Sequence, residues 1–208
     1  MESLGKIFGS SHRVKIMRLF LFHELEAFDI GDVSDRSLVK RPDARKELTM
    51  LTKIGFLKKK SFTKKIPKKA SKAEPNPGFK RVAAQGWILN KKFELAVPLQ
   101  SLLIDSELVK EKSLIKKLKK AGSIKLLALS GIFLRDENRN IDMLIVGDSL
   151  KREVLEKEIV TLESEIGREL SYAVFETKEF NYRITMYDKL IRDVLENKHS
   201  LIINKIKK

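Results

Sequence analysis

The sequence contains no cysteine, one tryptophan and three histidines. Without cysteine the chain can form neither disulfide bonds nor thiolate metal sites, which suits a reducing compartment such as the cytoplasm. The histidines, His12, His23 and His199, lie far apart and show no metal-ligand spacing. The sequence also lacks a phosphate-binding P-loop and a dinucleotide-binding fingerprint. We therefore expect no bound metal and no cofactor.

Long apolar runs are absent as well. A membrane-spanning helix needs roughly 18 apolar residues without charges, whereas Lys15 and Arg18 interrupt the first apolar stretch. Residues 1–11 lack the apolar run of a secretory signal peptide. We therefore expect a soluble, cytoplasmic protein that does not associate with a membrane.

The chain has a large excess of positive charge, and one segment contains nearly all of it. The formal net charge of the 208 residues is +15. Residues 40–92 contain 17 Lys and Arg against 3 Asp and Glu, a net charge of +14, whereas residues 1–39 have −1 and residues 93–208 have +2. Such charge can simply keep a surface solvated. A polyanion is the better-matched partner, because each neutralised phosphate releases a counterion.

The hydrophobic periodicity of the first 93 residues predicts three helices followed by two strands. The helices are expected over residues 3–23, 29–39 and 42–54, and the strands over residues 56–62 and 79–89. Ser10 or Ser11 and Asp29 are suitable helix caps, and Gly55 is suited to end the third helix. Residues 64–78 are rich in lysine and contain three prolines, which predicts a mobile loop between the strands.

The remainder of the chain predicts helices followed by an α/β pattern. Residues 93–121 indicate helical connecting segments with an apolar face that includes Leu95, Leu99, Leu102 and Leu103. Beyond Gly122, strands are expected over residues 123–129, 140–146, 169–175 and 201–206, and helices over residues 150–166 and 177–197.

The third predicted helix has one apolar and one polar face. A helix of this kind can enter the major groove of DNA, where Arg45 can make a bidentate contact with guanine. Thr49 and Thr52 can reach a base, a thymine methyl group or a phosphate. The residues expected to contact backbone phosphates are Lys40, Arg41, Lys46 and Lys53.

The lysine-rich loop provides a second set of cations. A basic loop can lie along the minor groove or the flanking backbone, where its contacts contain little base information. The expected phosphate contacts are Lys64, Lys65, Lys68, Lys69 and Lys72. Phe56, Phe62 and Trp87 are favoured as core residues, since strand aromatics pack well, although such residues can also stack on single-stranded bases.

Four segments indicate a family for the first half of the chain. They are Phe8-Gly9-Ser10-Ser11-His12-Arg13-Val14-Lys15-Ile16, Arg45-Lys46-Glu47-Leu48, Gly55-Phe56-Leu57 and Trp87-Ile88-Leu89-Asn90. In this order they resemble winged helix-turn-helix transcriptional regulators over about residues 3–93, a span typical of one small domain. The resemblance implies a domain that binds double-stranded DNA and, by analogy, a homodimer.

The second half contains Leu129-Ser130-Gly131-Ile132-Phe133, followed by Asn140-Ile141-Asp142-Met143. These segments resemble the minimal polymerase-beta-like nucleotidyltransferases over about residues 107–206, again the length of one domain. The family's chemistry uses a Gly-Ser turn and two carboxylates one residue apart on a strand. Those carboxylates share one face and hold two Mg²⁺ ions against the nucleotide phosphates. A third carboxylate comes from a later strand.

This sequence departs from the family pattern at each of those positions. Ser130 and Gly131 stand in the reverse order, and Asn140 leaves Asp142 as the one carboxylate of the pair. Asparagine is a neutral ligand and balances no charge on a hard cation. We therefore expect the fold to be retained and catalysis to be lost, with Ser130, Gly131 and Asp142 as vestigial site residues and no catalytic residue.

The expected fold class is α+β. A winged helix over residues 1–93 and a helical linker over 94–121 precede a small α/β nucleotidyltransferase-like domain with a mixed sheet over 122–208. The favoured function is a homodimeric DNA-binding transcriptional regulator, not an enzyme, whose C-terminal domain senses, dimerises or binds a protein partner. Two alternatives stay open: an active nucleotidyltransferase targeted by its N-terminal domain, and the antitoxin-like partner of a small toxin.

Overall fold

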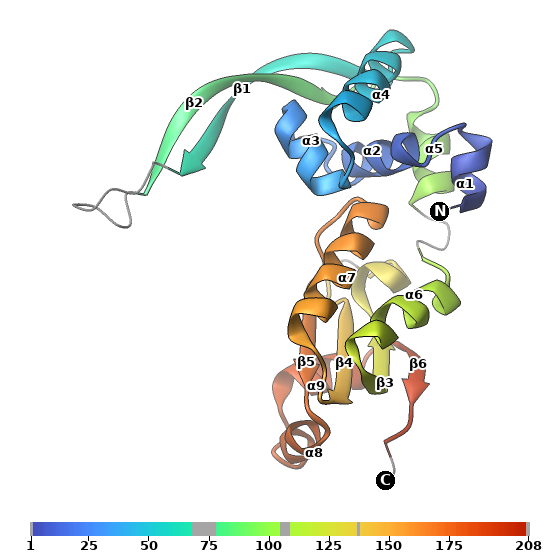
Figure 1. Ribbon diagram of the computed structural model, residues 1–208, viewed down its shortest axis with the longest axis vertical. Helices are drawn as coiled ribbons and strands as arrows, with labels where there is room; N and C mark the ends of the chain where they lie inside the picture. The colour runs from blue at the N-terminus through green and yellow to red at the C-terminus, as the bar shows by residue number, and fades with distance from the viewer. Residues whose placement is uncertain (1, 68–77, 105–108, 137, 207–208) are drawn as a thin grey trace. The chain divides into compact units, whose positions relative to one another are not determined.

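The computed structural model describes residues 2–67, 78–104, 109–136 and 138–206 (Figure 1). The chain divides into two compact units, Met1–Gln100 and Ser101–Lys208, each with its own set of buried apolar residues. Both units combine helices with strands, so the fold class is α+β. Within the described ranges, none of the helices has the length and apolar character needed to cross a bilayer.

The body of the N-terminal unit consists of α1 (Glu2–Ile7), α2 (Ser11–Phe22), α3 (Ile30–Ser37) and α4 (Arg41–Lys53). The single helix predicted over residues 3–23 is wrong, because Gly9 adopts a φ of 74° and the extended Ser10 caps α2. The side chain of Ser10 accepts a hydrogen bond from the backbone N–H of Arg13 at 3.2 Å, which satisfies one of the donors left free at a helix start.

The predicted second and third helices are confirmed as α3 and α4. Asp29 caps α3, and its side chain accepts a hydrogen bond from the backbone N–H of Asp32 at 2.9 Å. Gly55 follows α4 with a φ of 85°, a conformation that glycine adopts without strain. The helices pack through α2, whose dense apolar run is buried, and through Val33, Ala44, Leu48 and Leu51.

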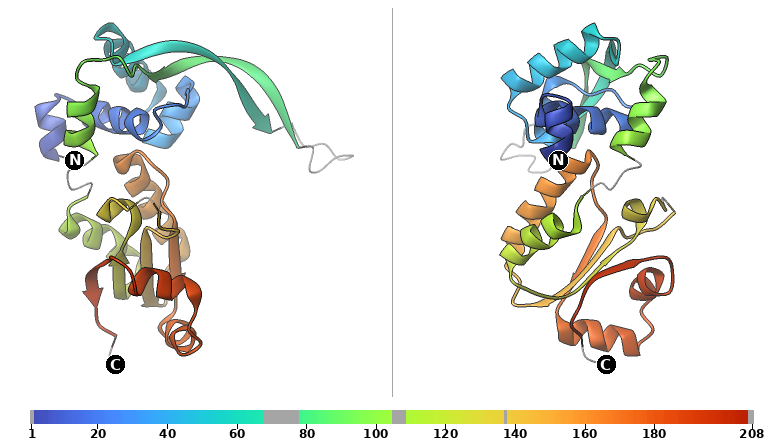
Figure 2. Two further views of the ribbon diagram at one scale, coloured as in Figure 1. Left: turned by 180° about the vertical axis from the view of Figure 1, so that it is seen from behind. Right: turned by 90° about the vertical axis from the view of Figure 1, so that its right-hand side faces the viewer.

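A long antiparallel hairpin follows the helices, formed by β1 (Leu57–Pro67) and β2 (Phe79–Leu89). Figures 1 and 2 show it extending well beyond the helices of its unit. We call its outer part, residues 60–67 and 79–86, the arm. The prediction that a loop begins at residue 64 is wrong, because β1 continues to Pro67 in register with Phe79. Lys68, Lys69 and Lys72 lie outside the described residues.

The two faces of the arm differ in exposure. Successive strand residues point to opposite faces, and half-buried Phe62, Lys64 and Ile66 alternate with exposed neighbours along β1. On β2 the half-buried residues are Val82 and Ala84, which stand opposite Lys64 and Phe62. This inner face is largely apolar, whereas the outer face combines polar and charged residues, among them Lys65 and Arg81, with exposed Ala83 and Phe79. The alternation explains why a lysine-rich segment forms a strand.

The base of the arm is fixed to the body by a backbone contact. Phe28 and Trp87 form an antiparallel bridge, with N–H to O=C distances of 3.0 and 2.9 Å between their backbones. A Cβ at neighbouring Gly86 would lie 2.2 Å from the Phe28 carbonyl oxygen. Glycine is therefore required where the two backbones meet. Of the aromatic residues favoured for the core, Phe56 is fully buried and Phe62 and Trp87 are half-buried.

The C-terminal unit contains a four-stranded sheet in the order β5-β4-β3-β6. Its strands are β3 (Ser123–Leu129), β4 (Met143–Asp148), β5 (Tyr172–Phe175) and β6 (Ser200–Asn204). The β4–β5 pair is parallel and the others are antiparallel, so the sheet is mixed, as the sequence predicted.

Helices cover both faces of this sheet (Figure 2). One layer contains α6 (Glu111–Leu118), the short 3₁₀ helix η1 (Lys119–Ala121) and α7 (Arg152–Ile166). The other contains α8 (Thr177–Thr185) and α9 (Lys189–Leu195), whose Phe180, Ile191 and Val194 pack against Leu126 and Leu144 of the sheet. The 3₁₀ helix η2 (Gly131–Leu134) follows β3.

Several boundaries differ from the predictions. The helix expected over residues 177–197 is broken into α8 and α9 at Tyr187, which adopts a φ of 54°. The segment 94–121, expected to be a linker, is divided between the units. Its first helix, α5 (Ala96–Leu103), crosses the division, whereas α6 packs against α7 and buries Leu114 and Leu118. Of the apolar face expected on this segment, Leu103 is buried and Leu95 and Leu102 are exposed.

We predict that Gly86→Ala destabilises the N-terminal unit by about 1–3 kcal/mol, because the added methyl group must push the Phe28 carbonyl away. Trp87 is the one tryptophan of the chain, so urea unfolding followed by its fluorescence reports this unit. The neighbouring exposed substitution Gln85→Ala serves as the control and should stay within about 0.5 kcal/mol of the wild type. Equal stability of both variants would contradict the close approach at Gly86.

Candidate nucleic-acid interface

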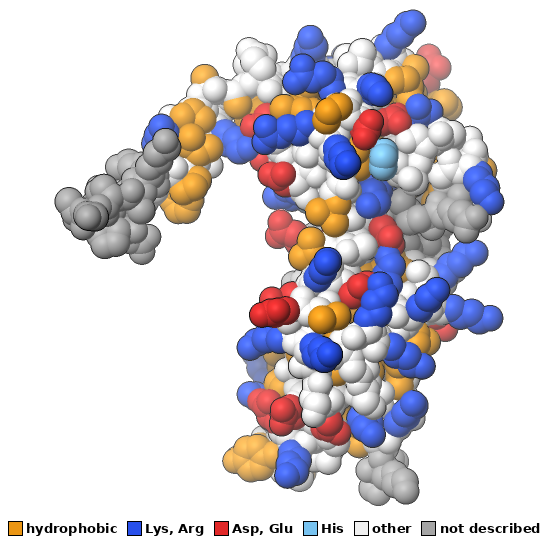
Figure 3. All heavy atoms as spheres, in the orientation of Figure 1, with side chains coloured by type: hydrophobic (Ala, Val, Ile, Leu, Met, Phe, Trp, Pro, Cys, Tyr) orange, Lys and Arg blue, Asp and Glu red, His pale blue; other side chains and the backbone are white. Residues whose placement is uncertain are grey.

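The exposed face of α4 is strongly basic. Arg45, Lys46, Thr49 and Lys53 are exposed on it. Lys40 occupies the extended N-cap position, and it too is exposed, as is the first helical residue, Arg41. Figure 3 shows Lys and Arg side chains gathered over α4 and the start of the hairpin. The structure therefore brings the polar residues predicted on this helix together on one surface.

Hydrogen bonds restrict what the two threonines of α4 can offer to a partner. The Thr49 hydroxyl donates to the Arg45 carbonyl at 2.8 Å, and the Thr52 hydroxyl donates to the Leu48 carbonyl at 2.7 Å. With the proton committed in this way, each hydroxyl can only accept a further hydrogen bond. Thr49 is exposed and Thr52 is half-buried, so Thr49 is the better placed of the two.

The acidic residues of α4 are balanced within the unit. Glu47 Oε2 lies 2.8 Å from Arg13 Nε, and Arg13 also donates to the Phe8 carbonyl at 2.7 Å. Asp43 lies 3.9 Å from the ammonium of Lys46. Because Arg13 neutralises the helix's half-buried carboxylate from the side of the body, the exposed face of α4 keeps a net positive charge.

Lys64 lies on the inner face of the arm and is bound to α3. Its Nζ lies 2.9 Å from Asp29 Oδ2 and 2.5 Å from Asp32 Oδ1. Desolvation by burial opposes ionisation of the group, but hydrogen bonds with the two carboxylates raise the pKa of Lys64. Burial likewise opposes ionisation of Asp29, and the hydrogen bond from Lys64 still lowers the pKa of Asp29. Lys64, which the sequence predicted to contact a phosphate, is thus bound to two carboxylates of its own unit.

The outer face of the arm presents cations to solvent. Lys65 on β1 and Arg81 on β2 are exposed and stand directly opposite each other in the strand register, and Lys59, just before the arm on the same face of β1, is exposed as well. Among the residues that the structure describes, no carboxylate forms an ion pair with any of these three. Sequence reasoning named Lys65 as a phosphate contact, but on a loop, and it missed Arg81, because only the strand pairing reveals that the two lie side by side.

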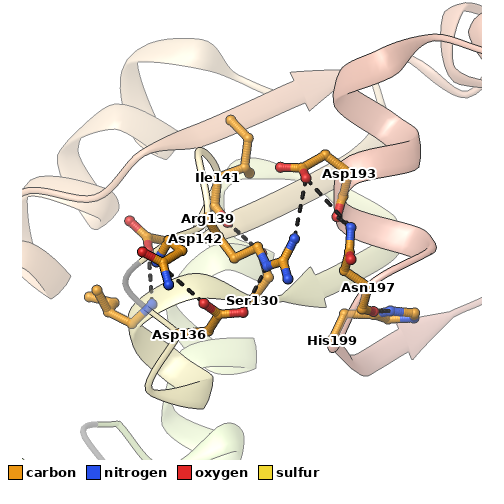
Figure 4. Close-up of polar contacts among 10 residues, drawn as sticks. Ser130, Asp136, Arg139, Ile141, Asp142, Asp193, Asn197 and His199 are labelled. Atoms are coloured by element: carbon orange, nitrogen blue, oxygen red, sulfur yellow. Dashed lines mark hydrogen bonds and ion pairs between the residues drawn. The ribbon is translucent and has the colours of Figure 1, made fainter.

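The segments that resemble a nucleotidyltransferase site form a compact hydrogen-bonded cluster around Asp142 in the C-terminal unit (Figure 4). We call it the Asp142 cluster. Ser130 N–H donates to the Asp142 carbonyl at 2.9 Å, and the Ser130 hydroxyl donates to the Ile141 carbonyl at 2.5 Å. The buried carboxylate of Asp142 accepts the N–H of Ile132 at 3.0 Å and the N–H of Ser171 at 2.9 Å. Each of its oxygens thus bonds a backbone donor.

Gly131 contributes to the Asp142 cluster through its backbone conformation. Its φ is 53°, and an added Cβ would lie 2.2 Å from Asp142 Oδ1. A glycine is therefore needed for the turn to approach the carboxylate closely. The three predicted vestigial residues lie together, as the resemblance implies, but their contacts are those of a packed turn.

Other carboxylates near the Asp142 cluster also have protein partners. Arg139 Nε lies 2.7 Å from Asp136 and its Nη1 lies 3.5 Å from Asp193, while Asn197 donates to the Asp193 carbonyl at 2.9 Å (Figure 4). The hydrogen bond from Arg139 lowers the pKa of Asp136. A guanidinium thus lies between two acids. Within the described part of the chain, no group of three His, Asp or Glu residues is arranged to hold a metal ion.

Asn140, which stands where the family has its first carboxylate, is exposed beside a pocket of about 760 Å³. The pocket is lined mainly by α9 and the turn before it, with Tyr187, Leu190 and Arg192 among its walls. Arg192 is held by both carboxylate oxygens of Glu196, at 2.7 and 2.9 Å. The lining combines the cations Lys189 and Arg192 with the acids Asp193 and Glu196, so its formal charges balance.

We predict that Asp142→Ala loosens the C-terminal unit, because two buried backbone donors lose their acceptor at a cost of about 1–3 kcal/mol each. Amide hydrogen exchange of peptides that cover β3 and β4 should accelerate on the order of a hundredfold. The control, Asp136→Ala, removes a more exposed carboxylate and should leave exchange in β3 nearly unchanged. Unchanged exchange in the Asp142 variant would show that its carboxylate has no structural role.

Comparison with known proteins assigns no family to the chain. No protein-family model matches the sequence, and neither a curated protein nor a solved structure matches the chain. The resemblances to winged-helix regulators and to nucleotidyltransferases therefore stay predictions, and a functional proposal depends on the geometry and charge of the two units.

Proposed function

We propose that the protein is a DNA-binding transcriptional regulator whose N-terminal unit is a winged helix. The observation that supports this most directly is the exposed basic face of α4 beside an arm whose outer face is also basic. Both surfaces belong to one unit, which contains the segment of net charge +14. Three carboxylates of this unit form ion pairs within it: Glu47 with Arg13, and Asp29 and Asp32 with Lys64.

In this proposal α4 enters the major groove of double-stranded DNA. Arg45 reads guanine with its two-pronged guanidinium, and Thr49 accepts a hydrogen bond from a base or contacts a thymine methyl group. Lys40, Arg41, Lys46 and Lys53 bind the flanking phosphates, which fix the register without specifying sequence. The arm serves as an elongated wing, and Lys65 and Arg81 extend the contact along the backbone.

The C-terminal unit then serves regulation or dimerisation, and not nucleotidyl transfer. Asp142, the one acid of the expected carboxylate pair, binds two backbone N–H groups. Asp136 and Asp193 share the guanidinium of Arg139. A two-metal mechanism needs carboxylates that are free to bind cations, and these three already have partners. We propose a cytoplasmic homodimer, by analogy with other regulators that read two half-sites.

We predict that Arg45→Ala weakens binding to the preferred duplex by about 1–3 kcal/mol and relaxes selectivity at one base pair. The preferred site would first be recovered by selection from a random duplex pool. The matched control is Lys46→Ala, one residue along α4, which removes a phosphate contact. It should weaken binding to all sequences equally and reduce the slope of log K against log salt by about 0.9. Equal loss on every sequence for Arg45→Ala would contradict base recognition by this residue.

A further inference from the structure

The arm is connected to its unit at two levels. The first is the Phe28–Trp87 bridge at its base. The second is Lys64, five residues further along β1 than Lys59, which stands opposite Trp87, or about 17 Å at the usual rise of a strand. A ribbon held at one level can pivot about that contact. A ribbon held at two levels has a defined direction.

Every carboxylate oxygen at the Lys64 contact has a hydrogen-bond partner. Asp29 and Asp32 form the capping box of α3, in which each carboxylate uses one oxygen to accept the other residue's backbone N–H, at 2.9 and 3.1 Å. The other oxygen of each carboxylate faces the Lys64 ammonium. All four oxygens are therefore occupied, two by the helix and two by the arm. The ammonium also relieves the repulsion between the two acids.

Strand geometry connects this contact to the outer face of the arm. Because adjacent residues point to opposite faces, fixing Lys64 inward forces Lys65 outward. Lys65 is directly opposite Arg81, and both are exposed. Like charges at directly opposed positions destabilise a sheet, so this pair is suited to an anion that lies between the two cations. Phosphate fits both the bidentate guanidinium and the ammonium.

We propose that the ion pairs of Lys64 with Asp29 and Asp32 form a latch that fixes the direction of the arm. By doing so, the latch aims a phosphate clamp, Lys65 and Arg81, at the backbone of the bound duplex. The latch is a property of the free protein, whereas the clamp rests on the proposed function. Lys64 is a positioning residue here and touches no nucleic acid.

The latch is tested in the free, full-length protein. The chain has no cysteine, so cysteines introduced at exposed His12 and Ala83 are the only attachment sites for spin labels. Pulsed electron resonance then measures the distance distribution between the body and the arm. Lys64→Gln should broaden this distribution at least twofold, whereas the adjacent control Lys65→Gln should leave it as in the wild type. An unchanged width in Lys64→Gln overturns the latch.

A second variant separates loss of the ion pairs from loss of folding. Replacing both Asp29 and Asp32 by asparagine removes the partners of Lys64 but keeps side chains that can cap α3. This double variant should broaden the distribution as Lys64→Gln does, with unchanged circular dichroism. A narrow distribution in the double variant contradicts a role for the two carboxylates.

Salt titrations with duplex DNA separate the latch from the clamp. Lys65→Gln and Arg81→Gln should each reduce the salt slope by about 0.9, the value for one lost phosphate contact. Lys64→Gln should lower affinity about tenfold with the slope unchanged, because the same phosphates are bound by a less ordered arm. A reduced slope with an unchanged distance distribution would identify Lys64 as a phosphate contact and overturn the proposal. If the wild type does not bind duplex DNA while Lys64→Gln broadens the spin-label distance distribution, the latch is supported and the proposed function is contradicted.

Discussion

The close approach of the Phe28 and Gly86 backbones determines where the hairpin leaves the body of the N-terminal unit. The approach is possible only because residue 86 has no side chain. It produces the bridge between Phe28 and Trp87, and from there β1 and β2 run outward in a fixed register. That register decides which face each lysine occupies. The contact at the base and the strand pairing together determine which face of the arm lies toward α3 and which faces solvent.

Charge in this unit is sorted by local geometry more than by sequence position. Lys64 and Lys65 are neighbours in the chain, yet one is bound between two carboxylates and the other faces solvent. Arg13 and Arg45 show the same division, since the first binds Glu47 and the second is exposed. The net charge of a segment therefore overstates the number of cations that are available to a polyanion. Only the cations that form no ion pair within the protein are available to a partner.

The sequence was most informative where apolar periodicity is strong. The predicted limits of β3 match the structure residue for residue, and α3, α4 and β2 were placed closely, because their apolar spacing and caps are local signals. The outer half of β1 was missed because its lysine content obscured the alternation of Phe62, Lys64 and Ile66. Arg81 and the partners of Lys64 were missed because they depend on residues about 16 and more than 30 positions away, which composition does not reveal.

The Asp142 cluster limits which substitutions this part of the chain can accept. Placing an aspartate at position 140 would create two carboxylates one residue apart, but the Asp142 carboxylate already accepts the N–H groups of Ile132 and Ser171. A cation would have to compete with the fold for the same oxygens, and Arg139 already holds the nearby acids. A metal site at this position would therefore form at the expense of contacts that stabilise the fold.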